Sequence, residues 1–341
     1  MSERFSPRPG LEAPLRRLIR EPAYVVLAVG LGLALLSELP QWLRLAPLGA
    51  SVLLLGLPHG AIDHLAPARA AGAQPTRRTL GVVGGVYLVA MSLYTVAWLV
   101  VPVLSFGFFI LMTWFHWGQG DLYVVLAEGT HLATRTQRLL CILTRGALPM
   151  LVPLVAFPDV YRRVAGLLID RFEPGAAASL APLFTPEARA GIGLLIAFLI
   201  GTHVTLGWVH GGGLGWRIDA AETIGLAAFF TVVPPIFAIG LYFTVWHSAR
   251  HLARLAHVDA EAAGLLRMGK VVQAINRVAK DAAPLTLASL AVLGVLWVLV
   301  PLPPSNPAEG IGLYLVFIAV LTLPHVLVVS WMDHVEGVWR P

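Results

Sequence analysis

The sequence predicts an all-α, polytopic integral membrane protein. Of its 341 residues, 57% are hydrophobic and 13% are charged, whereas soluble domains contain about 25% charged residues. Apolar stretches of about 20 residues recur along the chain, and this is the length that an α-helix needs to cross a bilayer. The net charge of +5 is interpreted as the excess of Arg and Lys that cytoplasmic loops of membrane proteins carry, and we expect no nucleic-acid partner.

We expect about ten membrane-spanning helices. The first apolar run is not followed by a small-residue cleavage site, so it is interpreted as a helix rather than a signal peptide. The segment 219–233 is short and ends at Pro234 and Pro235, which predicts a half-helix or a broken connection to the next segment. In chain order, the predicted segments are residues 22–39, 46–66, 79–101, 103–126, 139–157, 188–209, 219–233, 235–256, 283–302 and 311–334.

The longest polar connections are predicted at residues 158–187 and 257–282. The second is interpreted as an amphipathic helix that carries the basic residues Arg267, Lys270, Arg277 and Lys280. Three prolines lie within predicted segments and are expected to kink them, because proline cannot donate a helical hydrogen bond; they are Pro58, Pro153 and Pro324.

The chain is divided into an Arg- and Pro-rich cytoplasmic tail, residues 1–21, and a single transmembrane domain, residues 22–341, that contains the candidate metal site. With ten helices and a cytoplasmic N-terminus, 17 of the 24 Lys and Arg residues fall on the cytoplasmic side and 5 on the opposite side. Arg145 and Arg250 fall inside segments, and we expect Arg250 to extend to the cytoplasmic surface. This bias places both termini in the cytoplasm and predicts a multi-pass protein of the cell (inner or plasma) membrane.

Five histidines lie inside the apolar segments, where an ionisable side chain is costly and indicates a functional site. His59, His116, His247, His251 and His325 all lie on even-numbered predicted helices, which run in the same direction. Each lies at or beyond the midpoint of its helix, so all five are expected at one depth, between the bilayer centre and its cytoplasmic half. Histidines from distant parts of the chain can therefore meet there.

The histidine spacing favours a metal site. His247 and His251 are four residues apart, so both project from one helix face, as in a helical pair of metal ligands. Asp63 and Asp121 follow His59 and His116 by four and five residues. We expect each carboxylate to accept a hydrogen bond from the histidine nitrogen that does not bind the metal, or to be a ligand itself. A site of imidazoles without thiolates suits iron, zinc or copper, and Cys141 is the single cysteine.

The six other histidines are given weaker roles. His203 shares the depth of the five, whereas His64, His210 and His334 are predicted at the membrane interface and His131 and His257 in loops. Glycines flank two of the five buried histidines and are expected to allow close helix packing or to leave space for a substrate; they are Gly56, Gly60, Gly118 and Gly120.

Four motifs carry a resemblance to a known family. They are Gly-Leu-Pro-His-Gly-Ala-Ile-Asp at 56–63, Phe-His-Trp-Gly at 115–118 with Asp121, His-Ser-Ala-Arg-His at 247–251, and Pro-His at 324–325 with Asp333. In this order, over nearly the whole chain, they resemble the bacteriorhodopsin-related Brp/Blh family of membrane β-carotene 15,15′-dioxygenases. The resemblance implies a non-haem Fe(II) oxidoreductase that splits β-carotene with O2 into two molecules of retinal.

By motif match, the resemblance assigns the iron ligands to His59, His116, His247 and His251, and it leaves His325 as an outer or packing residue. The implied partners are β-carotene or a related carotenoid, O2, the lipid bilayer and a rhodopsin that accepts the retinal. A carotenoid dissolves only in the bilayer and is about 30 Å long, close to the hydrocarbon thickness. We therefore expect lateral entry between helices and a long apolar tunnel that passes the iron.

Two other functions fit parts of the pattern. A proton- or ion-coupled transporter would use the histidines as a relay, with water-lined access from both sides and no bound metal. A histidine-box diiron desaturase or hydroxylase needs more histidines in tight clusters, and only the pair His247 and His251 fits such a box.

Overall fold

The computed structural model describes residues 13–36, 38–299 and 307–340, and all regular structure in these ranges is helical. The first half of the chain forms α1 (Ala13–Leu36), α2 (Gln41–Ser51), the π-helix η1 (Val52–Gly56), α3 (Leu57–Ala61), α4 (Ala66–Ala70), α5 (Arg77–Val100), α6 (Pro102–Glu128), α7 (Arg135–Ala156) and α8 (Pro158–Ile169). The second half forms the 3₁₀-helix η2 (Ala176–Phe184), α9 (Pro186–His210), α10 (Gly213–Val232), α11 (Pro235–Leu241), the π-helix η3 (Tyr242–Ser248), α12 (Ala249–Val258), α13 (Ala260–Arg267), α14 (Val271–Leu299) and α15 (Pro307–Val335).

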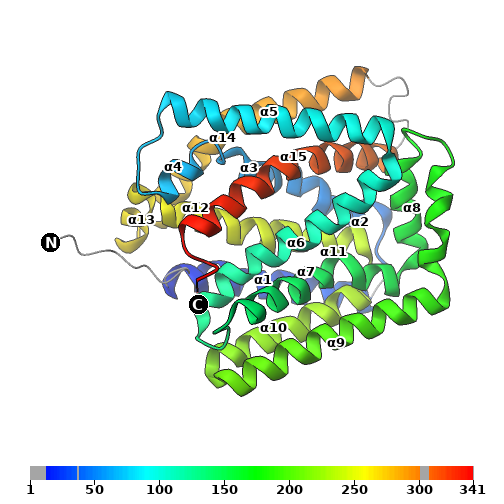
Figure 1. The fold of residues 1–341 in the computed structure, drawn as a ribbon, viewed down its shortest axis with the longest axis horizontal. Coiled ribbons are helices and arrows are strands. Elements are labelled where there is room, and N and C mark those ends of the chain that lie inside the picture. Colours follow the sequence, from blue (N-terminus) through cyan, green and yellow to red (C-terminus); the bar gives the residue numbers. More distant parts are fainter. Residues whose placement is uncertain (1–12, 37, 300–306, 341) are drawn as a thin grey trace.

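The long helices lie side by side in one bundle (Figure 1). Within the described ranges, six helices are long and apolar enough to cross a membrane, namely Arg17–Leu36, Arg77–Val100, Arg135–Ala156, Pro186–His210, Val271–Val295 and Glu309–Val335. The all-α membrane fold is thus borne out at the level of a polytopic helical protein. The count of ten spans and the cytoplasmic placement of both termini stay predictions.

Two of the predicted segments form broken helices. The second follows α2, η1 and α3, and the eighth follows α11, η3 and α12. Pro58 lies in the first turn of α3 and has no N–H to donate to the carbonyl of Leu54, which is one cause of the π-helical turn before it. Each broken helix carries its histidines at or just beyond the π-helical turn.

Polar residues and prolines define several helix starts. Thr76 and Thr134 cap α5 and α7 with reciprocal capping boxes, and Asp259 caps α13 by accepting a hydrogen bond from the Ala262 amide. Between α9 and α10 the chain turns through Gly212 and Gly213, whose positive φ angles of 54° and 76° favour glycine.

The structure corrects four details of the predicted elements. The segment 219–233 is not a half-helix, because α10 is a full helix of 20 residues; the alternative, a broken connection to the next segment, is confirmed, because α10 ends at Val232 and α11 begins at Pro235. The connection 158–187 contains α8 and η2, and the connection 257–282 forms α13 and the start of α14 rather than one amphipathic helix. The first helix begins at Ala13, inside the predicted tail; residues 1–12 of that tail, and residues 300–302 of the ninth segment, lie outside the described residues.

Three arginines contact the chain at opposite ends of the bundle. Arg135 and Arg138 donate to the carbonyls of Trp339 and Val338 beside the C-terminus, at the same end as the start of α1 (Figure 1). Arg189, predicted on the opposite side, donates to Val155 O at the end of α7. This placement agrees with an even number of crossings.

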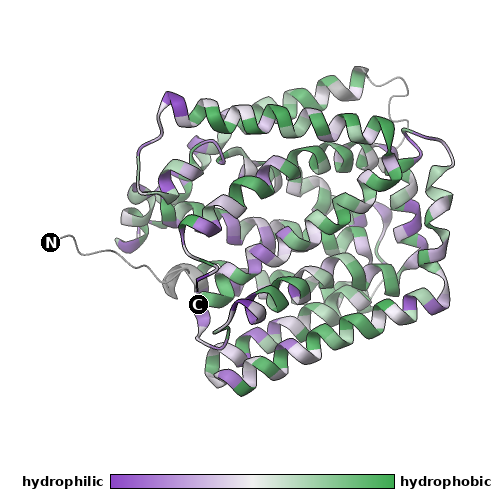
Figure 2. Cartoon of the chain, in the orientation of Figure 1, coloured by the Kyte–Doolittle hydropathy of each residue, from purple (hydrophilic) through white to green (hydrophobic). Residues whose placement is uncertain are grey.

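Exposure distinguishes central helices from peripheral ones. Within the most apolar stretch of each helix, 72% of the residues of α7 and 61% of those of α15 are buried. The corresponding shares are 17% for α5 and 11% for α14. The peripheral helices are largely hydrophobic, and hydrophilic residues occur inside the bundle and at the end near α13 (Figure 2). Apolar side chains directed outward with polar ones enclosed are the pattern expected of a protein surrounded by lipid.

Glycines allow α6 and α7 to pack closely. A Cβ atom on Gly118 would lie 2.0 Å from Ile142 O, and one on Gly146 would lie 1.8 Å from Trp114 O. Trp114 Nε1 also donates to Leu143 O at 2.7 Å across this contact. Small residues that let helix backbones approach are typical of membrane helix pairs, and here they fix the position of His116.

Candidate metal centre

The five buried histidines of the sequence analysis converge in the middle of the bundle. The His59 ring centroid lies 5.6 Å from those of His247 and His251 and 4.9 Å from that of His325. The His116 centroid lies 4.9 Å from that of His247 and 4.7 Å from that of His325. All five side chains are buried. They come from α3, α6, η3, α12 and α15, so the cluster joins elements that are far apart in the sequence.

The cluster has the donor atoms that a metal ion requires. The Nε2 atoms of His116, His247, His251 and His325 are buried and have no hydrogen-bond partner among the described residues. One nitrogen from each of His59, His116 and His325 can lie within 4.8 Å of the others. Buried imidazole nitrogens normally have partners, and leaving them unpaired is costly. Their convergence fits a divalent transition metal with nitrogen ligands.

The opposite ring nitrogens are held by the protein. His325 Nδ1 lies 2.6 Å from Asp63 Oδ2, and His59 Nδ1 lies 3.3 Å from Leu55 O. His116 Nδ1 lies 3.3 Å from Gln119 Oε1. A hydrogen bond at one imidazole nitrogen sets the tautomer and directs the other nitrogen to a metal.

The His116 contact continues into a second layer of polar side chains. Gln119 Nε2 donates to Asp333 Oδ2 at 2.7 Å. Asp333 forms an ion pair with Arg254 at 2.7 Å, and the guanidinium of Arg254 lies 4.1 Å from the ring centre of Tyr123. This chain of contacts braces α6 against α15 and α12.

Of the two carboxylates predicted to contact histidines, one contacts a different histidine and the other contacts none of the five. Asp63 does hold a histidine, but it holds His325 rather than His59, because α3 ends at Ala61 and the helical four-residue spacing does not continue. The expected contact between Asp121 and His116 is absent among the described interactions. A separation of five residues turns Asp121 well away from His116 on α6, and its oxygens bind Trp246 and Arg250 instead.

The glycines beside the histidines have two distinct roles. A Cβ atom on Gly56 would lie 2.5 Å from Ser51 O and 2.8 Å from the Phe243 ring, so Gly56 lets η1 approach η3. Gly60 and Gly120 instead face imidazoles, with their ideal Cβ positions 3.7 Å from the His325 ring and 3.4 Å from the His247 ring. Close packing, the first expected role, is therefore confirmed at Gly56, whereas histidine rings and not a substrate lie next to Gly60 and Gly120.

A cavity of about 680 Å³ adjoins the histidines, within the range of small-molecule sites. His59, His116, His247 and His325 line it, and most other lining residues are apolar. Along α15 the lining extends from Ile311 to His325, a distance of about 21 Å at the helical rise. The cavity is thus long and apolar and passes the histidines, as expected for a lipid-soluble substrate.

The lining also reaches the outer surface of the bundle. Leu80 of α5 and Leu285 and Val292 of α14 line the cavity, and all three side chains are exposed. The cavity therefore has walls on two helices that face the lipid.

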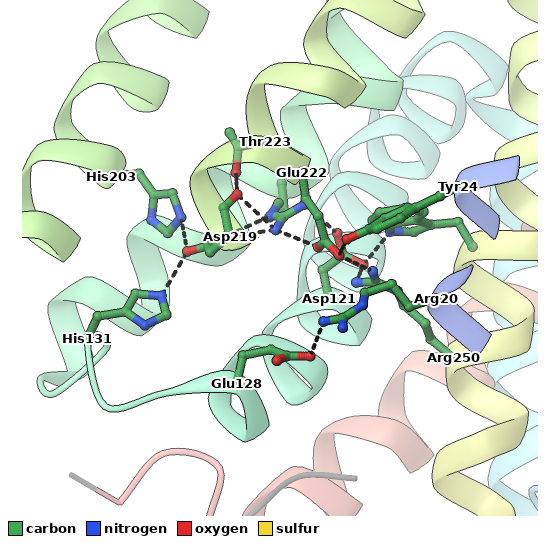
Figure 3. A network of polar contacts seen from close by, with 12 residues as sticks. Arg20, Tyr24, Asp121, Glu128, His131, His203, Asp219, Glu222, Thr223 and Arg250 are labelled. Atoms are coloured by element: carbon green, nitrogen blue, oxygen red, sulfur yellow. Dashed lines mark hydrogen bonds and ion pairs between the residues drawn. The ribbon is translucent and has the colours of Figure 1, made fainter. Parts of the chain in front are cut away.

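Arg250, which precedes His251 on α12, belongs to a buried ionic network (Figure 3). Arg250 Nη1 donates to Asp121 Oδ1 at 3.0 Å and Nη2 to Glu222 Oε1 at 3.1 Å. Its guanidinium lies 3.8 Å from the ring centre of Trp246, which itself donates to Asp121 Oδ1 at 2.9 Å. The expectation that Arg250 extends to the surface is wrong, because neighbouring helices present carboxylates to it inside the bundle.

The network continues through Arg145 to two further histidines. Arg145 Nη2 lies 2.7 Å from Asp219 Oδ1 and 3.0 Å from Glu222 Oε2. His131 Nε2 and His203 Nε2 lie 3.0 Å and 2.8 Å from Asp219 Oδ2. His203 thus belongs to this network and not to the five-histidine cluster, and His131, although in a loop as predicted, is buried.

Of the remaining histidines, one contradicts its predicted place, and the interfacial placement of the other three stays a prediction. His210 and His334 are exposed and His64 is partly exposed, whereas His257 lies in the last turn of α12 rather than in a loop.

Sequence reasoning did not assign roles to Arg145, Asp219, Glu222, Arg254 and Gln119. The available signal was the presence of charged residues in apolar helices, which by itself indicates an interior site but not the partner.

Comparison with known proteins agrees with the motif resemblance. A family model described as beta-carotene 15,15′-dioxygenase matches residues 50–333. The chain is 45% identical over 339 residues to the probable beta-carotene 15,15′-dioxygenase Blh of Halobacterium salinarum, covering 96% of this chain and 97% of that protein. It is 32% identical over 312 residues to the probable beta-carotene 15,15′-dioxygenase Brp of the same species, covering 85% of each chain. No solved structure matches the chain.

Proposed function

The chain belongs to the beta-carotene 15,15′-dioxygenase family, and from this premise we propose that the five-histidine cluster is the metal centre at which it cleaves its substrate. The enzyme is an oxidoreductase that converts β-carotene to retinal. Cleavage breaks the central C=C bond, and each of its two carbons gains one oxygen atom of O2, so that two aldehydes form. The observation that carries the proposal is the set of unpaired, buried imidazole nitrogens beside a long apolar cavity.

The proposed ligands are His59, His116, His247 and His251, and the geometry supports adding His325. Its Nε2 is unpaired within the described chain, and its Nδ1 is held by a carboxylate at 2.6 Å. This is the arrangement typical of metal-binding histidines. A structural role alone would not require its second nitrogen to point into the cluster.

The proposed metal is Fe(II). The cluster offers neutral nitrogen ligands and no thiolate, which suits iron, zinc or copper, and reaction with O2 favours the redox-active iron over zinc. When bound, the iron would supply the activation of O2 that a protein side chain cannot provide.

The protein residues bind and orient the substrate. The apolar lining desolvates the polyene and excludes water from the reacting double bond. β-Carotene is about 30 Å long, close to the thickness of the bilayer core, so each half of the molecule is about 15 Å long. When the central bond lies at the histidines, we propose that the two halves lie along the cavity walls formed by α15, α5 and α14. The exposed walls on α5 and α14 support lateral entry from the lipid.

The cellular context follows from the same site. We propose that the enzyme lies in the plasma membrane with both termini in the cytoplasm, as its charge distribution indicates. Retinal is apolar and reactive, so a membrane rhodopsin that accepts it from the bilayer is the proposed partner.

Expression in a host that accumulates β-carotene tests the function directly. We expect bleaching of the pigment, retinal in the lipid extract, and iron in the purified protein. A matched strain that expresses the His59→Ala variant should keep its pigment. Equal bleaching by both proteins would contradict the assignment of the histidine cluster as the reaction site.

A further inference from the structure

Gln119 lies between one of the proposed metal ligands and a buried ion pair. It follows His116 by three residues on α6, so the two side chains lie on the same side of the helix. Gln119 is 0% exposed, and its Oε1 lies 3.3 Å from His116 Nδ1. Its Nε2 lies 2.7 Å from Asp333 Oδ2 and 3.2 Å from Ser330 Oγ. The amide thus links His116 to α15.

The acceptor that faces His116 Nδ1 differs in kind from those of two other histidines in the cluster. His59 Nδ1 faces a backbone carbonyl oxygen, and His325 Nδ1 faces a carboxylate oxygen. An amide side chain can instead present either its oxygen or its NH2 group. The orientation of Gln119 therefore decides whether His116 Nδ1 donates or accepts a hydrogen bond.

Asp333 fixes this orientation. It forms an ion pair with Arg254 at 2.7 Å, both side chains are buried, and an ionised carboxylate has only acceptor atoms. Gln119 must therefore turn its NH2 group toward Asp333 and its oxygen toward His116. His116 Nδ1 then donates, which leaves no proton on Nε2, a buried nitrogen without a hydrogen-bond partner in the described chain.

We propose that Gln119 is a positioning residue that sets the tautomer of His116, and that Asp333 controls the orientation of Gln119 from α15. A neutral imidazole binds a metal through the nitrogen that carries no proton, and the hydrogen bond of the other nitrogen selects which one that is. The inference rests on the proposed function, because it takes the histidine cluster as the metal centre.

Reversing the amide should remove His116 from the ligands without changing a histidine. In Asp333→Asn, Arg254 attracts the oxygen of the new amide, so the NH2 group at position 333 faces Gln119. Gln119 then turns its oxygen toward this group and its own NH2 toward His116, whose proton moves to Nε2. Arg254 also donates to Glu336 at 2.9 Å, so its charge stays paired.

The measurement is the Fe(II) affinity of the purified full-length protein, taken from iron per protein after anaerobic equilibration with buffered Fe(II). Loss of the partner behind a metal-binding histidine typically lowers affinity about 10- to 100-fold, and we expect this loss in Asp333→Asn. Ser330→Ala is the matched control. It removes the other contact of the same NH2 group but leaves Asp333 in place, so it should bind Fe(II) as the wild type does.

A second substitution should restore the site. In the double variant Gln119→Glu, Asp333→Asn, the carboxylate at position 119 accepts hydrogen bonds from both His116 Nδ1 and the amide at position 333. We expect this variant to regain most of the lost affinity. Thermal melts of the metal-free proteins measure stability separately, because a merely structural role would change the melts and not the Fe(II) affinity of the folded protein.

Wild-type affinity in Asp333→Asn, an equal loss in Ser330→Ala, or a double variant no better than Asp333→Asn would overturn the inference while the metal centre stands. Should Asp333→Asn not fold, Gln119→Met, which has a similar volume and no amide, should show the same loss, and wild-type affinity in it would overturn the inference equally. A wild type that binds no Fe(II) would overturn the proposed metal centre and this inference with it.

Discussion

His325 Nδ1 lies 2.6 Å from Asp63 Oδ2, in a contact that joins the middle of α15 to the turn after α3. The same carboxylate oxygen accepts a hydrogen bond from the hydroxyl of Tyr87 on α5. The contact is buried, so water does not compete for it. It fixes one imidazole of the cluster in the orientation that directs its Nε2 toward the other histidines.

Replacing Asp63 should weaken metal binding without removing a histidine. Loss of a carboxylate behind a metal-binding histidine typically lowers metal affinity about 10- to 100-fold, so we expect Asp63→Asn to retain iron only at correspondingly higher free iron concentrations. Iron per protein after equilibration with buffered Fe(II) measures this. Tyr87→Phe removes one hydrogen bond to the same carboxylate and should have a smaller effect. Wild-type affinity in Asp63→Asn would show that the contact does not serve a metal.

Removing the guanidinium of Arg250 should strongly destabilise the protein. Arg250→Ala leaves the carboxylates of Asp121 and Glu222 buried without this partner, and breaking a buried ion pair costs about 3–5 kcal/mol. Arg250→Lys keeps the positive charge but lacks the planar guanidinium that donates to both carboxylates at once, so its loss of stability should be intermediate. The free energy of unfolding in mixed micelles is the measurement.

The control for the buried pair is an exposed one. Arg162 and Asp159 lie 3.9 Å apart, with side chains 53% and 78% exposed, and such pairs contribute about 0–1 kcal/mol. Equal effects of Arg162→Ala and Arg250→Ala would contradict the structural importance of the buried network.

The close approach of α6 and α7 predicts a strong difference between two glycines of one helix. Gly118→Ala places a Cβ atom 2.0 Å from Ile142 O, whereas no described atom lies within 4 Å of a Cβ on Gly107. Forcing extra volume into a packed interface typically costs about 1–3 kcal/mol, so Gly118→Ala should lower the unfolding temperature and Gly107→Ala should not. A thermal melt followed by circular dichroism decides between them; similar melts would mean that the helices are farther apart.

The junction between α12 and α13 should make stability depend on pH. Burial alone would raise the pKa of the Asp259 carboxyl, but hydrogen bonds from Arg277 and the Ala262 amide and the charge of Arg69 lower the pKa below its usual value. A lowered folded-state pKa means that the carboxylate stabilises the fold above its unfolded pKa of about 3.9, and that this stabilisation is lost as the pH falls through the folded-state pKa.

The matched variant for this junction is Asp259→Asn. At neutral pH it should lose about 2 kcal/mol, the typical contribution of hydrogen bonds to a charged group, and its stability should change less than that of the wild type below pH 4. Parallel pH profiles of the two proteins would contradict the role of the Asp259 charge.

The sequence was sufficient to predict the meeting of the histidines. Residues that share a helix direction and a depth can converge, and His59, His116, His247, His251 and His325 do so in the structure. This worked because the bilayer restricts helices to nearly one direction, which converts position in a helix into depth.

The partners of buried polar groups could not be predicted in the same way. The spacing of residues predicts on which side of its helix Arg250 lies. It does not predict that α6 and α10 place the carboxylates of Asp121 and Glu222 next to it. The partner of Asp63 was misassigned because the end of α3 at Ala61 is not visible in the apolar pattern. The π-helical turns η1 and η3 are likewise set by packing between helices, and hydropathy does not report them.

The iron content of His247→Ala tests the central claim most directly, that the buried histidines form the metal centre. The purified variant is compared with the wild type and with His210→Ala, whose imidazole is exposed at the end of α9, after all three are confirmed to be helical and to melt cooperatively. We predict stoichiometric iron and retinal formation in the wild type and in His210→Ala, and neither in His247→Ala. Wild-type levels of bound iron and retinal in His247→Ala would contradict this account of the site.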